Sequence, residues 1–184
     1  MSQENIESNQ SYVFIRKITG GIHAEAVALF KSSNGQFIVR KKYRPIHANI
    51  FRNEIKYLQL LADCPFVNKL IKYDESQLTM HLTYCGKPIT AKQRASYAST
   101  IKKYTQLLEK KWHVYHNDLK SENICLLDGQ IYFIDFGWAG SRRGNPGYGP
   151  KCLGYKGPLA KIKPNSESKD KSKYKKKKHK SKRR

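Results

Sequence analysis

The chain has 184 residues, of which 36 are Lys or Arg and 14 are Asp or Glu, giving a formal net charge of +22. A hydrophobic share of 39% excludes a wholly disordered protein, and this length suits one hydrophobic core better than two. Residues 161–184 contain 13 Lys or Arg and two acidic residues, and so hold half of the net charge. The composition therefore predicts a folded part of about 160 residues followed by a basic tail, 161–184, without fixed structure.

The cysteines and the apolar segments indicate an intracellular protein. The four cysteines show no Cys-x-x-Cys or other metal-ligand spacing, and free thiols are usual in a reducing compartment. Residues 1–10 are polar and acidic, unlike a secretory signal, and are expected to be a disordered terminus. No apolar run approaches the roughly 18 residues that a membrane-spanning helix needs. We expect a cytoplasmic or nuclear protein with no membrane partner.

The first half of the chain has the pattern of a β-sheet with one helix. Five runs rich in β-forming residues and bounded by turn residues are predicted to be strands: 12–19, 24–31, 36–43, 67–73 and 77–84. A helix is predicted at 48–62, where apolar residues recur at three- and four-residue spacings: Ile50, Phe51, Ile55, Leu58, Leu61 and Ala62. These elements predict a five-stranded antiparallel sheet with a single helix.

The second half is predicted to be smaller and more helical. Gly86-Lys87-Pro88 is read as a breaker, and 91–111 as a polar helix with one apolar side. Two short apolar runs, 124–127 and 130–136, are joined by Asp-Gly, a strong hairpin signal. Residues 137–158 contain seven glycines and three prolines and are predicted to be loop.

The most informative segment is 116–123, which reads His-Asn-Asp-Leu-Lys-Ser-Glu-Asn and is followed, after the hairpin, by Asp-Phe-Gly at 135–137. This resembles the catalytic loop and metal-binding signature of the protein kinase superfamily: His-Arg-Asp, four residues, Asn, and Asp-Phe-Gly one hairpin later. Ordinary turns require none of these spacings. The resemblance implies a protein-kinase-like two-lobe α+β fold, with 11–85 as the amino-terminal lobe and 86–160 as a reduced helical carboxy-terminal lobe.

The resemblance also implies a reaction, with ATP and Mg²⁺ as cofactors. Asp118 would orient the acceptor hydroxyl and take its proton, and Lys120 would neutralise charge on the transferred phosphoryl group. Asn123 and Asp135 would supply oxygen ligands of the kind that Mg²⁺ prefers. An Asp-Leu-Lys loop favours Ser or Thr hydroxyls of a protein substrate over Tyr.

Kinases place a lysine near the end of the third strand, where it binds ATP and pairs with a glutamate on the next helix. Lys41 shares a strand face with Val39, a small apolar residue suited to cover adenine, so strand periodicity favours Lys41 and leaves Lys42 as the alternative. Glu54 is the only acidic residue in the predicted helix 48–62. It is either the partner of the lysine or a solvated residue on a helix face.

The nucleotide-binding loop departs most from the family pattern, because Gly20 and Val27 match it but only one glycine of three is in place. Backbone groups from Thr83 to Cys85 lie where the kinase hinge would pair with adenine, although the segment also reads as the end of a core strand. Residues 23–26, His-Ala-Glu-Ala, are similar to a loop of the small atypical kinase of the tRNA threonylcarbamoyladenosine complex. The reduced kinases of large DNA viruses are similar in size.

Beyond the Asp-Phe-Gly motif the resemblance thins. Residues 144–151 resemble a worn end of the peptide-positioning segment, and most helices of the usual large lobe have no counterpart, so we expect an activating partner protein in their place. The run Lys169–Arg184 suits nuclear import, or binding to a nucleic acid or an acidic partner; the alternative is a solubilising tail.

Two other function classes stay open: a pseudokinase that binds nucleotide without transfer, and a nucleic-acid-binding accessory protein that acts through its tail. The presence of all six expected catalytic groups favours an active enzyme. They are Lys41, Glu54, Asp118, Lys120, Asn123 and Asp135.

Overall fold

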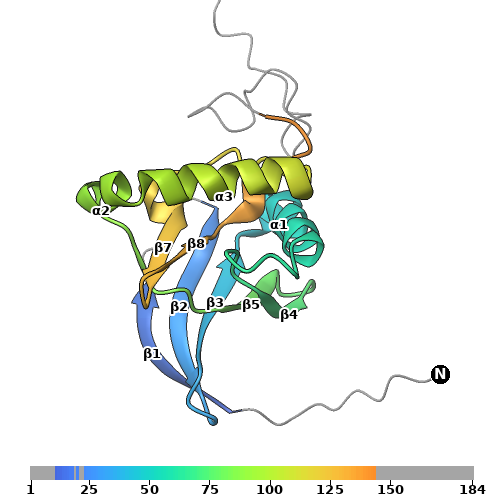
Figure 1. Cartoon of the computed structure of the whole chain (residues 1–184). Coiled ribbons are helices and arrows are strands. Elements are labelled where there is room, and N and C mark those ends of the chain that lie inside the picture. Colours follow the sequence, from blue (N-terminus) through green and yellow to red (C-terminus); the bar gives the residue numbers. More distant parts are fainter. Residues whose placement is uncertain (1–10, 19, 21–22, 144–184) are drawn as a thin grey trace, which may run out of the picture.

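The computed structural model of the protein describes residues 11–18, 20 and 23–143. The strands of its main sheet are β1 (Tyr12–Ile18), β2 (Ala24–Ser32), β3 (Phe37–Tyr43), β4 (Leu70–Asp74) and β5 (Thr79–Thr83). They are all antiparallel to their neighbours, in the order β1-β2-β3-β5-β4 (Figure 1). The predicted five-stranded antiparallel sheet is therefore confirmed. The predicted terminus 1–10, the segment 144–151 and the basic tail 161–184 lie outside the described residues.

Side chains of β3 alternate between the two faces of the sheet, as strand geometry requires. On one face Ile38 packs with Ala28 and Phe30 in a small buried cluster. On the other face Val39 packs against the main core, and Lys41 is buried in turn. The side of β3 that carries Lys41 thus faces the interior of the protein.

The fourth strand begins at Leu70, whereas the predicted range begins at Val67. Val67 is buried and forms a parallel bridge to Phe133, at the end of a later strand, β8 (Gln130–Phe133). The prediction was wrong here because Val67 is apolar for a different reason: it joins the two parts of the chain instead of extending β4.

Helix α1 (Ala48–Leu60) follows one turn of 3-10 helix, η1 (Pro45–His47). Its buried side chains are Ile50, Phe51, Glu54, Ile55, Tyr57 and Leu58. Ala62, predicted to lie on the apolar face, is exposed because the helix ends at Leu60. The apolar stripe otherwise faces the core, and the buried set includes the carboxylate of Glu54.

Two helices, α2 (Ala91–Ser96) and α3 (Ala98–Lys111), run end to end across one side of the molecule (Figure 1). The sequence pattern predicted one helix over 91–111, but the structure has a break at Tyr97. Thr90 begins α2 with a capping box in which its side chain and that of Gln93 satisfy each other's backbone amides.

A second, three-stranded sheet is formed by β6 (Lys87–Pro88), β7 (Ile124–Leu127) and β8. Gly86-Lys87-Pro88 does end the run of β5 ahead of α2, as predicted, but the sequence pattern missed the short strand β6, which pairs with Leu126 and Cys125 of β7. Gly86 makes this possible: its φ is +87°, and a Cβ at this position would lie 2.0 Å from the carbonyl oxygen of Leu126.

Strand β8 ends at Phe133, earlier than the predicted limit of 136. The amide of Ile134 donates to the carbonyl of Asn123 at 3.0 Å, and Asp135 then has a left-handed backbone with φ 64°. This residue turns the chain out of the sheet and into a short 3-10 turn, η3 (Phe136–Trp138).

The main hydrophobic core connects both parts of the chain. Phe66 stacks on Tyr104 of α3 with 4.1 Å between ring centroids, and meets Phe133 of β8 edge to face at 5.9 Å. The same cluster extends from Tyr43 at the end of β3 to Ala139 after η3. It therefore crosses the predicted lobe boundary and anchors the two loops that carry the predicted site.

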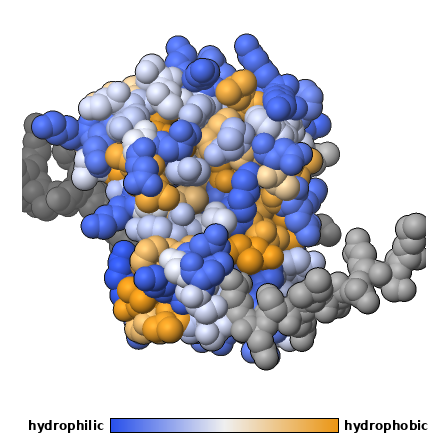
Figure 2. Space-filling model, turned by 60° about the horizontal axis from the view of Figure 1, so that its bottom comes forward, coloured by the Kyte–Doolittle hydropathy of each residue, from blue (hydrophilic) through white to orange (hydrophobic). Residues whose placement is uncertain are grey.

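The large apolar side chains that remain exposed lie in β1, β3, β4, η1 and α1. They are Val13, Phe14, Ile15, Phe37, Ile46, Leu60, Ile71 and Tyr73. Figure 2, which brings the lower side of Figure 1 forward, shows apolar patches among the polar residues of this face. Within the described residues, no helix is long and apolar enough to cross a membrane.

Candidate active site

A buried cluster of charged side chains joins three separate elements. Lys41 Nζ of β3 lies 2.9 Å from Glu54 Oε2 of α1 and 2.9 Å from Asp135 Oδ1, which follows β8. The Glu54 side chain is 0% exposed and that of Lys41 is 11% exposed. The hydroxyl of Tyr43 also donates to Glu54 Oε2. The fold thus places one cation between two carboxylates, with a phenol completing the partners of Glu54 Oε2.

Each charge of this cluster depends on the others. Burial alone would lower the pKa of Lys41, but the carboxylates of Asp135 and Glu54 outweigh burial and hold that pKa well above its usual range. Burial would raise the pKa of Asp135, but Lys41 outweighs it and the pKa is lowered. For Glu54 burial dominates over Lys41, so the pKa of its carboxyl is raised. Lys41 and Asp135 are therefore held charged.

The neighbouring lysine, Lys42, lies on the opposite side of β3. Its Nζ is 3.3 Å from Glu25 of β2, and both side chains are nearly half exposed. Glu54 is fully buried, which excludes the reading of this residue as a solvated glutamate. The structure therefore gives Lys41, and not Lys42, the carboxylate partner on α1.

The second group of predicted site residues lies in the loop that precedes β7. Asn123, at the end of a 3-10 turn η2 (Ser121–Asn123), donates from Nδ2 to the Asp118 carbonyl at 2.8 Å and to Asp118 Oδ2 at 2.9 Å. Lys120 Nζ lies 3.2 Å from the same Oδ2. The amide of Asn123 and the ammonium group of Lys120 thus fix the orientation of the Asp118 carboxylate.

His116 connects this loop to the strand that leads to Asp135. Its Nε2 donates to the carbonyl of Ile134 at 2.8 Å, while its Nδ1 accepts from the amide of Asp118 at 3.4 Å. The ring also packs on Phe136 with 4.5 Å between centroids. Burial lowers the pKa of His116, so the ring is neutral, as one donating and one accepting nitrogen require. The histidine sets the spacing between the two groups of site residues.

Asn117, next to the predicted catalytic residue Asp118, has a structural role of its own. Asn117 has a left-handed backbone with φ 62°, a conformation that asparagine tolerates better than most residues. Its Nδ2 donates to the carbonyls of Trp138 and Arg142, at 3.2 Å each. Asn117 therefore ties the loop to the segment that follows Asp135. In the kinase pattern, an arginine occupies the position of Asn117.

Sequence reasoning missed Asn53, which is adjacent to Glu54 on α1. Its Nδ2 donates to the carbonyls of Gly137 and Ala139, at 3.0 Å each. Nothing in the sequence distinguishes this asparagine from a solvated one. Gly137 lies so close to α1 that a Cβ there would be 2.5 Å from Cγ2 of Ile50. The segment after Asp135 is thus fastened directly to α1.

The predicted nucleotide-loop residues lie near this cluster. Val27 of β2 is opposite Lys41 in the sheet register, and a Cβ on Gly20 would be 2.9 Å from Val27 Cγ2. His23, which follows the loop, packs edge to face on Trp138 with 5.1 Å between centroids. The end of the predicted loop therefore reaches the segment after Asp135.

At the predicted hinge, the backbone of Thr83 is partly occupied. Its amide donates to the Lys69 carbonyl at 2.9 Å, and its side chain accepts from the Lys69 amide at 2.8 Å. Cys85 is buried, and its thiol contacts the carbonyl of Thr83 at 3.7 Å. Any hinge contact with a ligand would therefore use other groups than the Thr83 amide.

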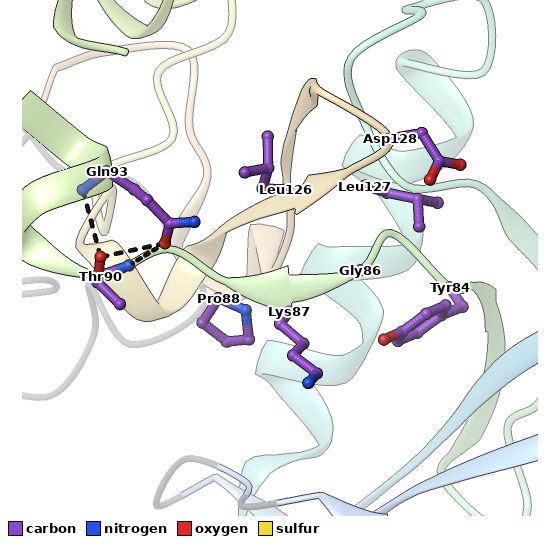
Figure 3. Close-up of a pocket in the computed structure, with 9 residues that line it drawn as sticks. All are labelled: Tyr84, Gly86, Lys87, Pro88, Thr90, Gln93, Leu126, Leu127 and Asp128. Carbon is purple, nitrogen blue, oxygen red and sulfur yellow. Dashed lines mark hydrogen bonds between the residues drawn. The ribbon is translucent and has the colours of Figure 1, made fainter. Parts of the chain in front are cut away.

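A pocket of about 460 Å³ adjoins the predicted hinge. Figure 3 shows it between Tyr84, β6 and the β7–β8 turn, with the capped start of α2 at one side. Its lining includes Gly86, Lys87 and Asp128. It includes no residue of the Lys41 group (Lys41, Glu54 and Asp135) or of the Asp118 group (Asp118, Lys120 and Asn123). The pocket is thus separate from the charged side chains.

Comparison of the sequence with known proteins does not assign the chain to a family. No model of a known protein family matches the chain, and no curated protein matches it either. The arrangement of the side chains is therefore the basis for proposing a function.

Proposed function

We propose that the protein is an ATP- and Mg²⁺-dependent phosphotransferase of the protein-kinase type, acting on a Ser or Thr hydroxyl of a protein. The observation that carries the proposal is that Lys41 Nζ contacts the carboxylates of both Glu54 and Asp135. In protein kinases this lysine–glutamate pair and an aspartate of the Asp-Phe-Gly motif must all be in place for phosphoryl transfer. The motif spacing and the contacts agree on the same residues.

The donor groups fit Mg²⁺ bound together with a nucleotide. Among the described residues, no group of three or more His, Cys, Asp or Glu side chains is placed to hold a metal alone. Mg²⁺ usually takes one or two carboxylates and completes its shell with phosphate oxygens and water. Asp135 is 33% exposed, and Asn123 uses its nitrogen on Asp118, so that its oxygen remains as a ligand. When bound, the ion would neutralise phosphate charge.

The chain's own residues divide the remaining work. Lys41 would hold the nucleotide phosphates by its positive charge, and Glu54 would keep its side chain in position. Asp118, oriented by Asn123, would accept the proton of the attacking hydroxyl. Lys120 has 54% of its side chain exposed and would move from Asp118 to the transferred phosphoryl group.

Asp118→Asn tests the proposal directly. We expect transfer from radiolabelled ATP to mixed Ser/Thr peptides to fall by about 10²- to 10⁴-fold, because the variant loses the base. ATP binding should change little, since Asp118 is not a metal or phosphate contact. Asp128→Asn is the matched control, because Asp128 is exposed and lies in the β7–β8 turn. ATP binding without transfer by the wild type would instead indicate a pseudokinase.

Lys41→Met and Lys42→Met separate the two candidate lysines. Lys41→Met should abolish transfer and weaken nucleotide binding, whereas Lys42→Met should leave both nearly unchanged, because only Lys41 contacts Glu54 and Asp135. Thermal unfolding of both variants shows whether a loss reflects the site or the fold. Loss of activity in folded Lys42→Met alone would contradict the assignment.

Activity should not require phosphorylation of the chain itself. The contacts of Asn117 with Trp138 and Arg142 hold the segment after Asp135 without a phosphate. Phosphatase treatment, followed by removal of the phosphatase, should therefore leave transfer unchanged. A large drop would mean that a basic residue of this segment reads a phosphate group.

A further inference from the structure

The side of α3 that faces away from the core is strongly basic. Ile101 and Leu108 are buried, and Tyr104 stacks on Phe66, so one face of the helix is committed to the core. Residues of the opposite face are exposed, and α3 runs end to end with α2 across one side of the molecule (Figure 1). The exposed lysines of the two helices are Lys92, Lys102, Lys103, Lys110 and Lys111.

This charge is not balanced locally. The sequence of α2 and α3 contains one acidic residue, Glu109. Both of its carboxylate oxygens accept from Nη2 of Arg143, at 2.6 and 2.7 Å. Within the described chain, none of the five exposed lysines forms a salt bridge. The face therefore keeps its full positive charge.

The basic residues form a stripe with hydrogen-bonding neighbours. At 100° per residue, one side of α3 presents Ser99, Lys102, Lys103, Gln106 and Lys110, all exposed. A rise of 1.5 Å per residue places Lys102 and Lys110 about 12 Å apart along the axis. Lys92 lies on α2, which runs end to end with α3 beyond the break at Tyr97 (Figure 1). Lysine with Ser and Gln between is the composition of a surface that contacts phosphates.

We propose that this stripe on α3, extended by Lys92, binds the phosphate backbone of a nucleic acid. A protein partner is the weaker reading, because protein interfaces have an apolar, aromatic centre and the exposed large apolar residues of this structure all lie outside α2 and α3. The proposal is independent of phosphoryl transfer, since none of these lysines belongs to the Lys41 or Asp118 groups.

The test compares two triple variants of the full chain. Lys102→Gln/Lys103→Gln/Lys110→Gln removes three charges from the stripe, and Lys17→Gln/Lys56→Gln/Lys72→Gln removes three exposed lysines elsewhere. Fluorescence anisotropy with a labelled 24-base-pair RNA duplex is measured across a salt series. The stripe variant should reduce the slope of log Kobs against log salt concentration by about 2 to 3, at roughly 0.9 per lost phosphate contact. The control triple should reduce the slope by less than about 1.

Two results would overturn the proposal. Equal slopes for both triple variants would mean that the duplex is attracted by overall charge and not by this stripe. Displacement of the duplex by polyglutamate as readily as by unlabelled RNA of equal charge would mean that the surface suits an acidic protein instead. Circular dichroism and thermal unfolding show that the variants are folded, and the single substitution Lys103→Gln should reduce the slope by about 0.9 by itself.

Discussion

The two groups of residues in the candidate active site are built in opposite ways. The Lys41 group joins residues 13 and 94 positions apart in the sequence, and its lysine and glutamate are buried. Asp118, Lys120 and Asn123 lie within one loop, and the first and the last are five positions apart. Two of the side chains are partly open, with 26% of Asp118 and 54% of Lys120 exposed, whereas Asn123 is buried.

This difference in burial predicts that substitutions in the two groups have different effects. A buried charge that loses its partner remains uncompensated in the interior, whereas an exposed one is stabilised by water. Substitutions in the Lys41 group should therefore mainly lower the stability of the fold. Substitutions in the Asp118 group should mainly lower the proposed phosphoryl transfer. Glu54→Ala tests this comparison directly, and three further changes test the contacts of residues outside the two groups.

The largest effect is expected for Glu54→Ala. It removes the carboxylate that Lys41 and Tyr43 share in the interior, while Lys41 keeps its contact with Asp135. The loss should therefore lie near the lower end of the about 3–5 kcal/mol that breaking a buried pair costs. Asp118→Ala, in the open loop, should lower the free energy of unfolding by less than about 1 kcal/mol. Urea denaturation of both variants measures the difference. Equal losses would show that the two groups do not differ as described.

Gly137→Ala should be the next most damaging change. A Cβ at this position would lie 2.5 Å from Cγ2 of Ile50, and overpacking of this kind costs about 1–3 kcal/mol. If the clash is the cause, adding Gly137→Ala to an Ile50→Ala background should cost almost nothing further. The same loss in both backgrounds would place the cause elsewhere.

Asn53→Ala removes two hydrogen bonds, to the carbonyls of Gly137 and Ala139, and should cost about 1–2 kcal/mol. Asn53→Asp should cost more than Asn53→Ala, because it would place a negatively charged acceptor against two carbonyl oxygens, whereas alanine only removes the donor. Gln59→Ala, on the exposed side of α1, is the control and should change stability little. An Asp variant as stable as the wild type would contradict the assigned contacts.

The smallest effect concerns pH and lies outside both groups. Burial, with the charges of Lys72 and Arg40, lowers the pKa of His81 from 6.5 to about 4. Below pH 6.5 the unfolded chain takes up a proton that the folded chain refuses until about pH 4, so stability falls as the pH falls through this window. His81→Gln should reduce that fall by less than about 1 kcal/mol, because the ring is only part-buried. Urea denaturation of the wild type and of His81→Gln at pH 7 and pH 5 measures this difference. The same pH dependence in both proteins would contradict the lowered pKa of His81.

Local patterns in the sequence determined a large part of the fold. Alternation along β3 placed Lys41 on the same face as Val39, since the side-chain period of a strand is fixed by its geometry. The five-residue step from Asp118 to Asn123 kept both on one loop. Apolar spacing likewise predicted α1, although its last turn was extended too far, to Ala62.

Only the tertiary structure decided what becomes of each polar residue. Glu54 and Asn53 stand side by side on α1, and the apolar spacing of this helix favoured the inward side for Glu54 but gave no sign that Asn53 would be anything other than solvated. Glu54 is buried against Lys41, 13 positions earlier in the chain, and Asn53 binds the carbonyls of Gly137 and Ala139, which lie 84 and 86 positions later. Similarly, Lys87 and Pro88 join a sheet because the partner strand β7 arrives from far along the chain. Such contacts depend on which surfaces meet after folding. A periodic pattern indicates which face of an element is buried, but not which residues will pack against that face.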